Sequence, residues 1–184
     1  MGNSIKTIYY GAFDGCSSLD SIYIPASVTE ISDNAFRNCS NLRTITVDPA
    51  NQSYSSIDGV LFDKTQETLC KFPAGWFNRK GKEVAEKDNG FDFPKKMTRI
   101  GKYAFAGCLG LSTLSTTKSV KAIDENAFYG CKNLYSVKIT KSVKNIGEGA
   151  FGGCISLTSI TIPKSTTVAK GAFNDNKNLT IVRK

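Results

Sequence analysis

Histidine is missing from all 184 residues of this chain. Histidine is the side chain that most often acts as a general base near neutral pH, and its imidazole is a common zinc ligand. Its absence excludes Ser/His and Cys/His nucleophile systems and any zinc site that needs an imidazole. Carboxylates, lysine, tyrosine or cysteine would have to carry any catalysis, and no convergent set of them stands out. We therefore predict a protein that is not an enzyme.

Long apolar segments are also missing. A membrane-spanning helix needs about 20 predominantly apolar residues in a row, and no stretch of this sequence approaches that length. The N-terminus has neither the basic region nor the apolar region of a secretory signal peptide. Residues 4–8 match the end of a motif that recurs later. We expect no insertion into a membrane, and we expect the chain to be a piece of a longer protein.

Acidic residues are scarce in the C-terminal part of the chain. Residues 110–184 hold 11 Lys and Arg against 4 Asp and Glu, so they carry +7 of the formal net charge of +8. A basic surface of this kind attracts polyanions, and it also keeps a protein soluble without any specific partner. Both explanations stay open. No block of like charge or nucleic-acid motif is present, so we expect no nucleic acid partner.

One motif recurs along the chain with a period of 23 residues. In its first copy Ile8 is followed by Ala12-Phe13, Cys16, Leu19 and the run Ile22-Tyr23-Ile24-Pro25. Self-similarity at a fixed period of this length predicts a solenoid, in which every repeat stacks on its neighbours. The six copies begin at residues Ile8, Ile31, Ile100, Ile123, Ile146 and Val168.

The spacing of apolar residues changes within each copy. Phe13, Cys16, Leu19 and Ile22 are three residues apart, which suits a turn-rich or 3-10-like arc. Ile22 and Ile24 alternate with polar neighbours, as in a short strand. Stacked copies would bury their apolar sides in one continuous core. We predict an α/β solenoid with short parallel strands on one sheet face and irregular or 3-10 arcs on the other.

Residues 48–90 interrupt the repeat. Two runs at 57–62 and 68–72, separated by a short turn, predict one inserted β-hairpin. The polar, glycine-containing stretch 74–90 predicts a loop or irregular arc. Within it, Trp76 is expected to pack against the hairpin rather than to be exposed.

Two further strands are predicted from local similarity. Cys70-Lys71-Phe72-Pro73 and Phe91-Asp92-Phe93-Pro94 both match the pattern of Ile22-Tyr23-Ile24-Pro25. We therefore place both runs in the stacked sheet, which gives eight rungs. Their centres are expected near residues 23, 46, 71, 92, 115, 138, 161 and 183.

Five of the six cysteines occupy one column of the repeat, and stacking is expected to align them in a ladder. Parallel Cβ vectors on neighbouring rungs are unfavourable for disulfides. No CxxC pair exists, which weakens a metal site as well. We expect small buried thiols, with Cys70 at an inward strand position. The ladder consists of Cys16, Cys39, Cys108, Cys131 and Cys154.

Two short motifs imitate functional signatures. Residues 147–152 spell GxGxxG, but the same positions of another copy read Ser32-Asp33-Asn34-Ala35-Phe36-Arg37, so the glycines belong to a repeat turn. Ser115 and Lys118 have the spacing of a serine acyl-enzyme motif, which requires both side chains on one helix face. A strand end followed by a turn does not provide that. We expect no catalytic residue, no cofactor and no metal.

The outward side chains of the strands are the candidate binding residues. Side chains that repeat on one sheet face, rung after rung, make an extended surface suited to a large ligand. Most of them are small hydroxyls, which also fits a face that is merely solvated. The column predicted to bind a ligand is Tyr23, Thr46, Lys71, Asp92, Ser115, Lys138 and Thr161, with Arg183 continuing it.

The repeat pattern resembles the BspA-like, or treponemal-type, class of leucine-rich repeats. Ile-Gly-x-x-Ala-Phe-x-x-Cys-x-x-Leu-x-x-Ile-x-Ile-Pro describes the copies, and residues 146–154 follow it nearly completely. The insert around 47–62 is also similar to a feature of bacterial members. The resemblance covers nearly the whole chain and implies a single leucine-rich repeat domain over residues 1–184.

Members of this class are mostly large secreted or surface-attached proteins, and some bind host matrix and plasma proteins. The resemblance therefore implies an extracellular or cell-surface interaction module with a protein ligand such as fibronectin or fibrinogen. Two alternatives stay open. The repeats can be a structural spacer whose ligand site lies elsewhere, or the basic C-terminal half can bind polyanions such as glycosaminoglycans.

Overall fold

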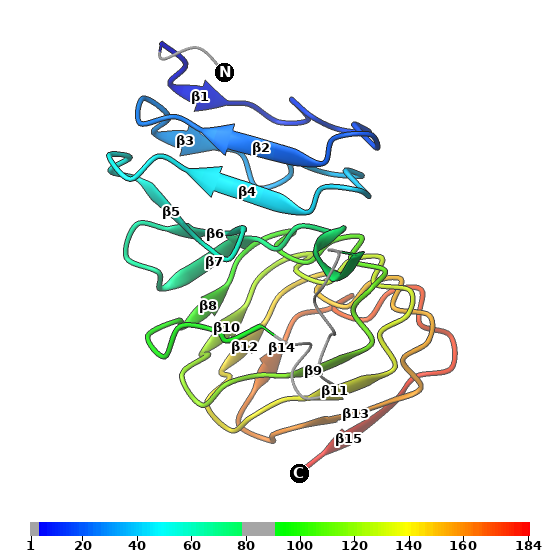
Figure 1. Cartoon of the computed structure of the whole chain (residues 1–184). Helices are drawn as coiled ribbons and strands as arrows, with labels where there is room; N and C mark the ends of the chain where they lie inside the picture. The colour runs from blue at the N-terminus through cyan, green and yellow to red at the C-terminus, as the bar shows by residue number, and fades with distance from the viewer. Residues whose placement is uncertain (1–3, 79–90) are drawn as a thin grey trace.

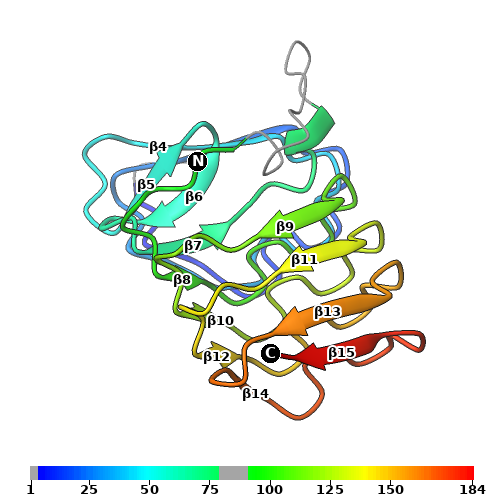
Figure 2. The same ribbon diagram turned by 90° about the horizontal axis from the view of Figure 1, so that it is seen from below.

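The alternating residues at the end of each repeat form short parallel strands, and these strands stack into a β-solenoid (Figure 1). The computed structural model describes residues 4–78 and 91–184. In the N-terminal part, β2 (Ser21–Ile24) pairs with β4 (Thr44–Val47). Figure 2 shows the four strands of the C-terminal part side by side. These are β9 (Thr113–Ser115), β11 (Ser136–Lys138), β13 (Ser159–Ile162) and β15 (Thr180–Arg183).

A second set of parallel strands lies earlier in each rung, where the repeats begin. In the regular repeats each of these strands is only two residues long, and we call them the narrower strand set. Sequence analysis predicts strands on only one face of the solenoid, so this second set is an addition to the expected fold. β1 (Thr7–Ile8) pairs with β3 (Glu30–Ile31), and a longer series follows in the C-terminal part. That series consists of β8 (Arg99–Ile100), β10 (Ala122–Ile123), β12 (Asn145–Ile146) and β14 (Thr167–Val168).

The arcs between the two strand sets are turns rather than helices. Within an arc, successive amides bond carbonyls three residues back, as in Cys16 N–H to Phe13 O at 3.1 Å. The residue before each ladder position has a positive φ, for example 73° at Gly15 and 58° at Asn38, and this conformation interrupts a helical run. The described residues contain no α-helix and one 3-10 helix, η1 (Trp76–Asn78). The α/β class and the 3-10 arcs are therefore not confirmed.

The insert contains the predicted hairpin and one more strand. β6 (Val60–Asp63) pairs antiparallel with β7 (Thr68–Lys71), and β5 (Tyr54–Ile57) pairs antiparallel with β6. Asp58 and Gly59 join β5 to β6 with φ values of 47° and 79°, as a two-residue hairpin turn of type I′ requires. β7 then pairs in parallel with β8, so the insert continues the narrower strand set.

Near the start of the insert, the side chain of Asn51 supplies hydrogen-bond donors to a turn of the first rung. Its side chain is fully buried, and its Nδ2 donates to the carbonyls of Pro25 and Val28, each at 2.9 Å. Its Oδ1 accepts from the amides of Ser53 and Tyr54, each at 2.8 Å. Two of these hydrogen bonds tie the insert to the first rung, and the other two fix the chain within the insert.

A column of phenylalanine rings forms the centre of the core. Phe105, Phe128 and Phe151 stack with ring centroids 4.9 and 5.0 Å apart, and all three are buried. The insert divides the core into an N-terminal cluster and a C-terminal cluster. The expectation that Trp76 packs is confirmed, because its side chain is 2% exposed and its Nε1 donates to Asp58 O at 3.0 Å. The rings form one stack in each cluster: Phe13 with Phe36 in the N-terminal cluster, and Phe72, Phe105, Phe128, Phe151 and Phe173 in the C-terminal cluster.

The expected cysteine ladder is present, but the expectation of buried thiols is wrong for Cys16, which is exposed, and Cys70 is only partly buried. From Cys39 onward, each ladder thiol donates to a carbonyl of the rung before it. Cys131 Sγ donates to Phe105 O at 3.1 Å, and Cys154 Sγ donates to Phe128 O at 3.2 Å. In the last rung Asn176 takes this position, and its Nδ2 donates to Phe151 O at 2.7 Å. All six cysteines are free thiols. Burial raises the pKa of Cys108 and Cys154 to about 12.

The prediction of two outer strands from local similarity is wrong. Leu69 pairs with Ile100, so the run 68–71 belongs to the narrower strand set and not to the outer sheet. Phe72, which follows directly, stacks on Phe105 at 4.8 Å and takes a place in the phenylalanine column. Residues 91–93 form no strand. The similarity to Ile22-Tyr23-Ile24-Pro25 therefore misleads at both places. Most of the loop predicted at 74–90 lies outside the described residues.

Candidate functional site

Five of the predicted binding residues lie on the exposed face of the outer strands. Tyr23 and Thr46 are directly paired neighbours on β2 and β4. Lys138 on β11 pairs with both Ser115 and Thr161 on the flanking strands. These side chains alternate with buried ones, because successive residues of a strand point to opposite faces. The structure thus brings the predicted column together in two groups, one on each side of the insert.

Tyr23 is the one large side chain of the N-terminal group, and it is held in place. Its side chain is 46% exposed, and its hydroxyl donates to Asp48 Oδ2 at 2.6 Å. This hydrogen bond raises the pKa of Tyr23 and lowers the pKa of Asp48. The aromatic face is therefore presented to solvent in one orientation, which suits a contact residue.

Lys71 does not belong to the exposed column, and this part of the prediction is wrong. The residue is 4% exposed, because β7 joins the narrower strand set and turns this side chain into the protein. Its Nζ donates to the carbonyl oxygens of Tyr103 at 3.1 Å and Ala106 at 3.4 Å. Burial lowers the pKa of Lys71. Lys71 therefore connects the insert to the next arc through hydrogen bonds and does not face solvent.

Two other members of the predicted column are displaced. Asp92 is exposed, but residues 91–93 form no strand, so it does not extend the sheet face. Arg183 does not continue the column, because Thr161 pairs with Val182. The step from β13 to β15 is 21 residues, two fewer than the period of 23. Arg183 instead pairs with Ile162, and its guanidinium donates to Thr166 O at 2.7 Å.

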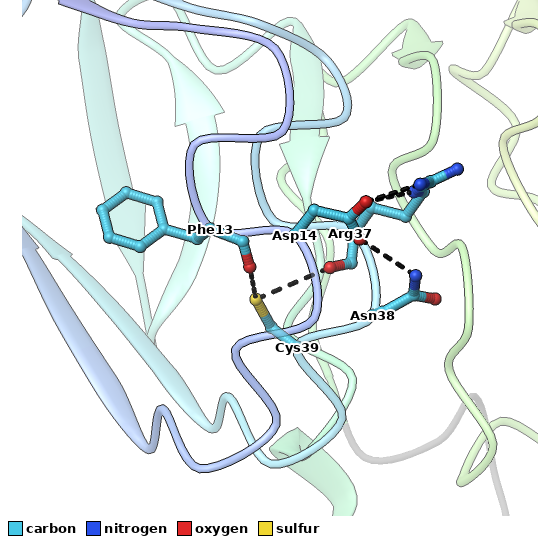
Figure 3. A network of polar contacts seen from close by, with 5 residues as sticks. All are labelled: Phe13, Asp14, Arg37, Asn38 and Cys39. Carbon is cyan, nitrogen blue, oxygen red and sulfur yellow. Dashed lines mark hydrogen bonds and ion pairs between the residues drawn. The ribbon is translucent and has the colours of Figure 1, made fainter.

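A cleft of about 550 Å³ opens beside the insert, where the arc of the second rung faces the arcs of the C-terminal rungs. Tyr103, Tyr129 and Leu109 contribute apolar surface, and Arg37 and Lys132 contribute positive charge. Figure 3 shows that Arg37 and Asn38 both reach Asp14, with Arg37 Nε and Oδ2 3.1 Å apart and Asn38 Nδ2 and Oδ1 2.9 Å apart. None of the described residues that line the cleft is a carboxylate.

This cleft is not among the sites predicted above, although the sequence contains a feature that indicates it. In the regular rungs a phenylalanine is followed three residues later by the ladder residue, whereas Phe72 is followed by Pro73, Ala74 and Gly75. The arc of this rung therefore has no ladder side chain, and a gap remains between the neighbouring arcs. Among the described lining residues, neither Cys39 nor Ser40 has a histidine or carboxylate beside it in the cleft. Within residues 4–78 and 91–184, no group of three or more His, Cys, Asp or Glu is arranged to hold a metal.

The repeat geometry can be compared with known families. The model of the BspA type leucine-rich repeat region matches residues 1–77 and 86–183, in six copies. The chain belongs to this family. A leucine-rich cell surface protein of Faecalibacterium prausnitzii, known from a crystal structure, is 34% identical with a TM-score of 0.78. The match covers 98% of the BspA-type chain described here and 45% of that protein.

Two further solved structures share the fold of this BspA-type chain. A leucine-rich repeat protein of Bacteroides ovatus is 26% identical with a TM-score of 0.56, over 98% of this chain and 41% of that one. The pneumococcal vaccine antigen PcpA is 21% identical with a TM-score of 0.67, over 90% of this chain and 45% of that one. The chain thus spans less than half the length of these three proteins. No curated protein matches it. The described residues include no helix long and apolar enough to cross a membrane.

Proposed function

We propose that this chain is a non-enzymatic interaction module of a bacterial surface or secreted protein, and that its outer strand face contacts an extracellular protein ligand. The observation that carries the proposal is the exposed column of Lys138, Ser115 and Thr161 on hydrogen-bonded neighbouring strands. The likeness to a cell surface protein of Faecalibacterium prausnitzii supports the location.

The strand face has the properties that a protein-binding surface needs. Its backbone is fixed by parallel hydrogen bonds, and its inward residues Val137 and Ile160 are anchored in the core. The backbone of this face therefore loses little conformational freedom when a ligand binds, which favours affinity. Lys138 and Tyr23 are the two large side chains of the predicted column on this face, so they are the expected contact residues.

Reversing the charge of Lys138 tests this face directly. We expect Lys138→Glu to weaken binding to immobilised fibronectin or fibrinogen about tenfold at physiological salt, which corresponds to about 1.4 kcal/mol. Tyr23→Ala tests the N-terminal group in the same assay. Surface plasmon resonance at physiological and high salt measures both effects.

Lys132→Glu is the matched control, because Lys132 is an exposed lysine of the same rung that lies on the arc. The control should bind like the wild type. Equal losses for both variants would contradict a site on the strand face. If the wild type binds neither protein, the alternative of a structural spacer is favoured, and the small hydroxyl side chains of Ser115 and Thr161 agree with it.

A further inference from the structure

The C-terminal rungs share a corner in which lysines repeat at one position. Each outer strand segment ends in a turn that is closed by a backbone hydrogen bond between its first and fourth residues. These bonds join Met97 N to Pro94 O at 2.9 Å, Val120 N to Thr117 O at 3.3 Å, Val143 N to Thr140 O at 3.1 Å and Thr166 N to Pro163 O at 3.0 Å. The second residue of each turn is a lysine. These are Lys95, Lys118, Lys141 and Lys164, and all four are exposed.

A second lysine column lies next to the first. Lys121 and Lys144 directly follow the buried residues that close two of these turns. Lys144 N donates to Lys121 O at 2.7 Å, so the two residues occupy the same place on adjacent rungs. Both side chains are exposed. We call the six residues Lys95, Lys118, Lys121, Lys141, Lys144 and Lys164 the lysine corner.

No described carboxylate neutralises the lysine corner. Among the described residues of this half, ion pairs join Arg99 of β8 to Asp124 at 2.8 Å and Lys102 to Glu125 at 3.1 Å, and neither includes a corner lysine. The one hydrogen bond that a corner lysine side chain makes to the described protein joins Lys144 Nζ to Lys141 O at 3.4 Å. Neighbouring strands are about 4.8 Å apart, so six positive charges occupy a strip that is roughly 15 Å long. Such a strip creates a strong local positive potential.

Five of the eleven Lys and Arg residues of 110–184 therefore lie in the lysine corner. The corresponding positions of the first rung hold Ala26 and Thr29, so the lysine corner is confined to the C-terminal rungs. The hydroxyls of Ser119 and Ser142, which follow two of these lysines, bond to Thr117 and Thr140 within the turns, so the lysines supply the donors of the strip. Ammonium donors that repeat along one line fit a linear ligand with regularly repeated anionic groups.

We propose that the lysine corner binds a linear sulfated polysaccharide of the glycosaminoglycan type, aligned with the axis of the solenoid. The regular spacing and the point charges of lysine favour sulfate groups along a chain. Nucleic acid is the less suitable polyanion, because the strip contains no aromatic side chain on which bases can stack and no arginine to read base edges. This site is separate from the outer strand face and does not depend on the function proposed for that face.

Two triple variants with the same change in net charge test the proposal. Lys118→Gln, Lys141→Gln and Lys164→Gln together remove three corner lysines. Lys132→Gln, Lys170→Gln and Lys177→Gln remove three exposed lysines of the arcs in the same half. Isothermal titration with heparin, repeated over a series of salt concentrations, measures the affinity and its salt dependence.

We expect the corner variant to bind heparin at least tenfold more weakly than the wild type at about 0.1 M salt. Its slope of log affinity against log salt should shrink by about two to three, because fewer counterions are released. The arc variant should stay within about threefold of the wild type. Desulfated heparin should not bind.

Three results would overturn the proposal. The wild type could fail to bind heparin at low salt, or both variants could lose the same affinity, which would indicate diffuse charge. Single-stranded DNA or anionic vesicles could bind as tightly as heparin, which would reject a polysaccharide as the preferred partner. Binding of the corner variant to fibronectin or fibrinogen separates this test from that of the strand face, because Lys138 is unchanged in it.

Discussion

Replacement of Phe128 by alanine is expected to lower the free energy of unfolding by about 4 kcal/mol. The ring is completely buried and stacks between Phe105 and Phe151 at centroid distances of 4.9 and 5.0 Å. The neighbouring rungs cannot close the resulting cavity, because backbone hydrogen bonds fix their spacing. One such bond joins Phe128 N to Ala150 O at 2.7 Å. Urea unfolding followed by circular dichroism measures the loss.

Tyr129→Ala is the control for this variant. Tyr129 is the next residue on the same arc and is 48% exposed, so its truncation should cost about 1 kcal/mol or less. Phe128→Leu should fall between the two, because leucine fills part of the space. If Phe128→Ala and Tyr129→Ala destabilise the protein equally, the stacked column is not the main source of stability.

The free energy of unfolding is expected to fall strongly at alkaline pH. Burial raises the pKa of Cys70, Cys108 and Cys154 to about 12 and raises that of Cys131 well above 9.0. In the unfolded chain these thiols lose their protons near pH 9, so the folded state binds more protons above that pH. Stability that is fully present below pH 9 is therefore lost as the pH rises toward 12.

The expected size follows from the same linkage. At pH 10.5 each thiol with a pKa of about 12 costs about 2 kcal/mol of stability, and several together approach the total stability of a typical domain. The lowered pKa of Lys71 acts in the opposite direction up to its ordinary value of 10.5, but it is a single group. The urea midpoint should fall steeply between pH 8.5 and pH 10.5.

A cysteine variant provides the control for this pH dependence. Cys154→Ala removes one titrating thiol, so the slope of unfolding free energy against pH should become shallower by about 1.4 kcal/mol per pH unit near pH 10.5. The variant is less stable at neutral pH, but only the slope matters for the comparison. A wild-type midpoint that stays constant from pH 8.5 to pH 10.5 would show that the buried thiols do not govern alkaline stability.

The parts of the fold that repeat are the parts that sequence predicts well. Phe105, Phe128 and Phe151 recur every 23 residues, and each is buried at the same place in its rung. The ladder of Cys131 and Cys154 follows from the same period. A periodic pattern makes the buried positions predictable, because every copy must satisfy the same packing and the same hydrogen bonds.

The insert is predicted less well, because its residues fit two registers. Cys70-Lys71-Phe72-Pro73 has the alternation of an outer strand, yet Phe72 fills the phenylalanine column and Leu69 pairs with Ile100. The spacing from Leu69 to Phe72 is three residues, whereas that from Ile100 to Phe105 is five. This shortened arc breaks the period, and only tertiary packing decides that Lys71 is buried.

The candidate sites, like the fold, are predictable from the sequence only in part. Alternation in β11 places Lys138 outward, and it is exposed as predicted. The positive charge of residues 110–184 is readable from the sequence, but its concentration in the lysine corner depends on the turns that align Lys118, Lys141 and Lys164. The missing ladder residue after Phe72 is readable from the sequence, but the cleft beside Arg37 also depends on the distance between two arcs that lie far apart in the chain.

The register of the C-terminal rungs determines which changes in chain length this half can tolerate. Ala122 pairs with Asn145 in a step of 23 residues, so loss of one whole period would rejoin chemically equivalent positions. Loss of a single residue within a strand would shift the side chains of that strand between inside and outside. The final step, from Asn145 to Thr167, is one residue shorter and is accommodated at the edge of the sheet. Deletions in this half should therefore be neutral in multiples of one rung and damaging otherwise, except at its outermost turn.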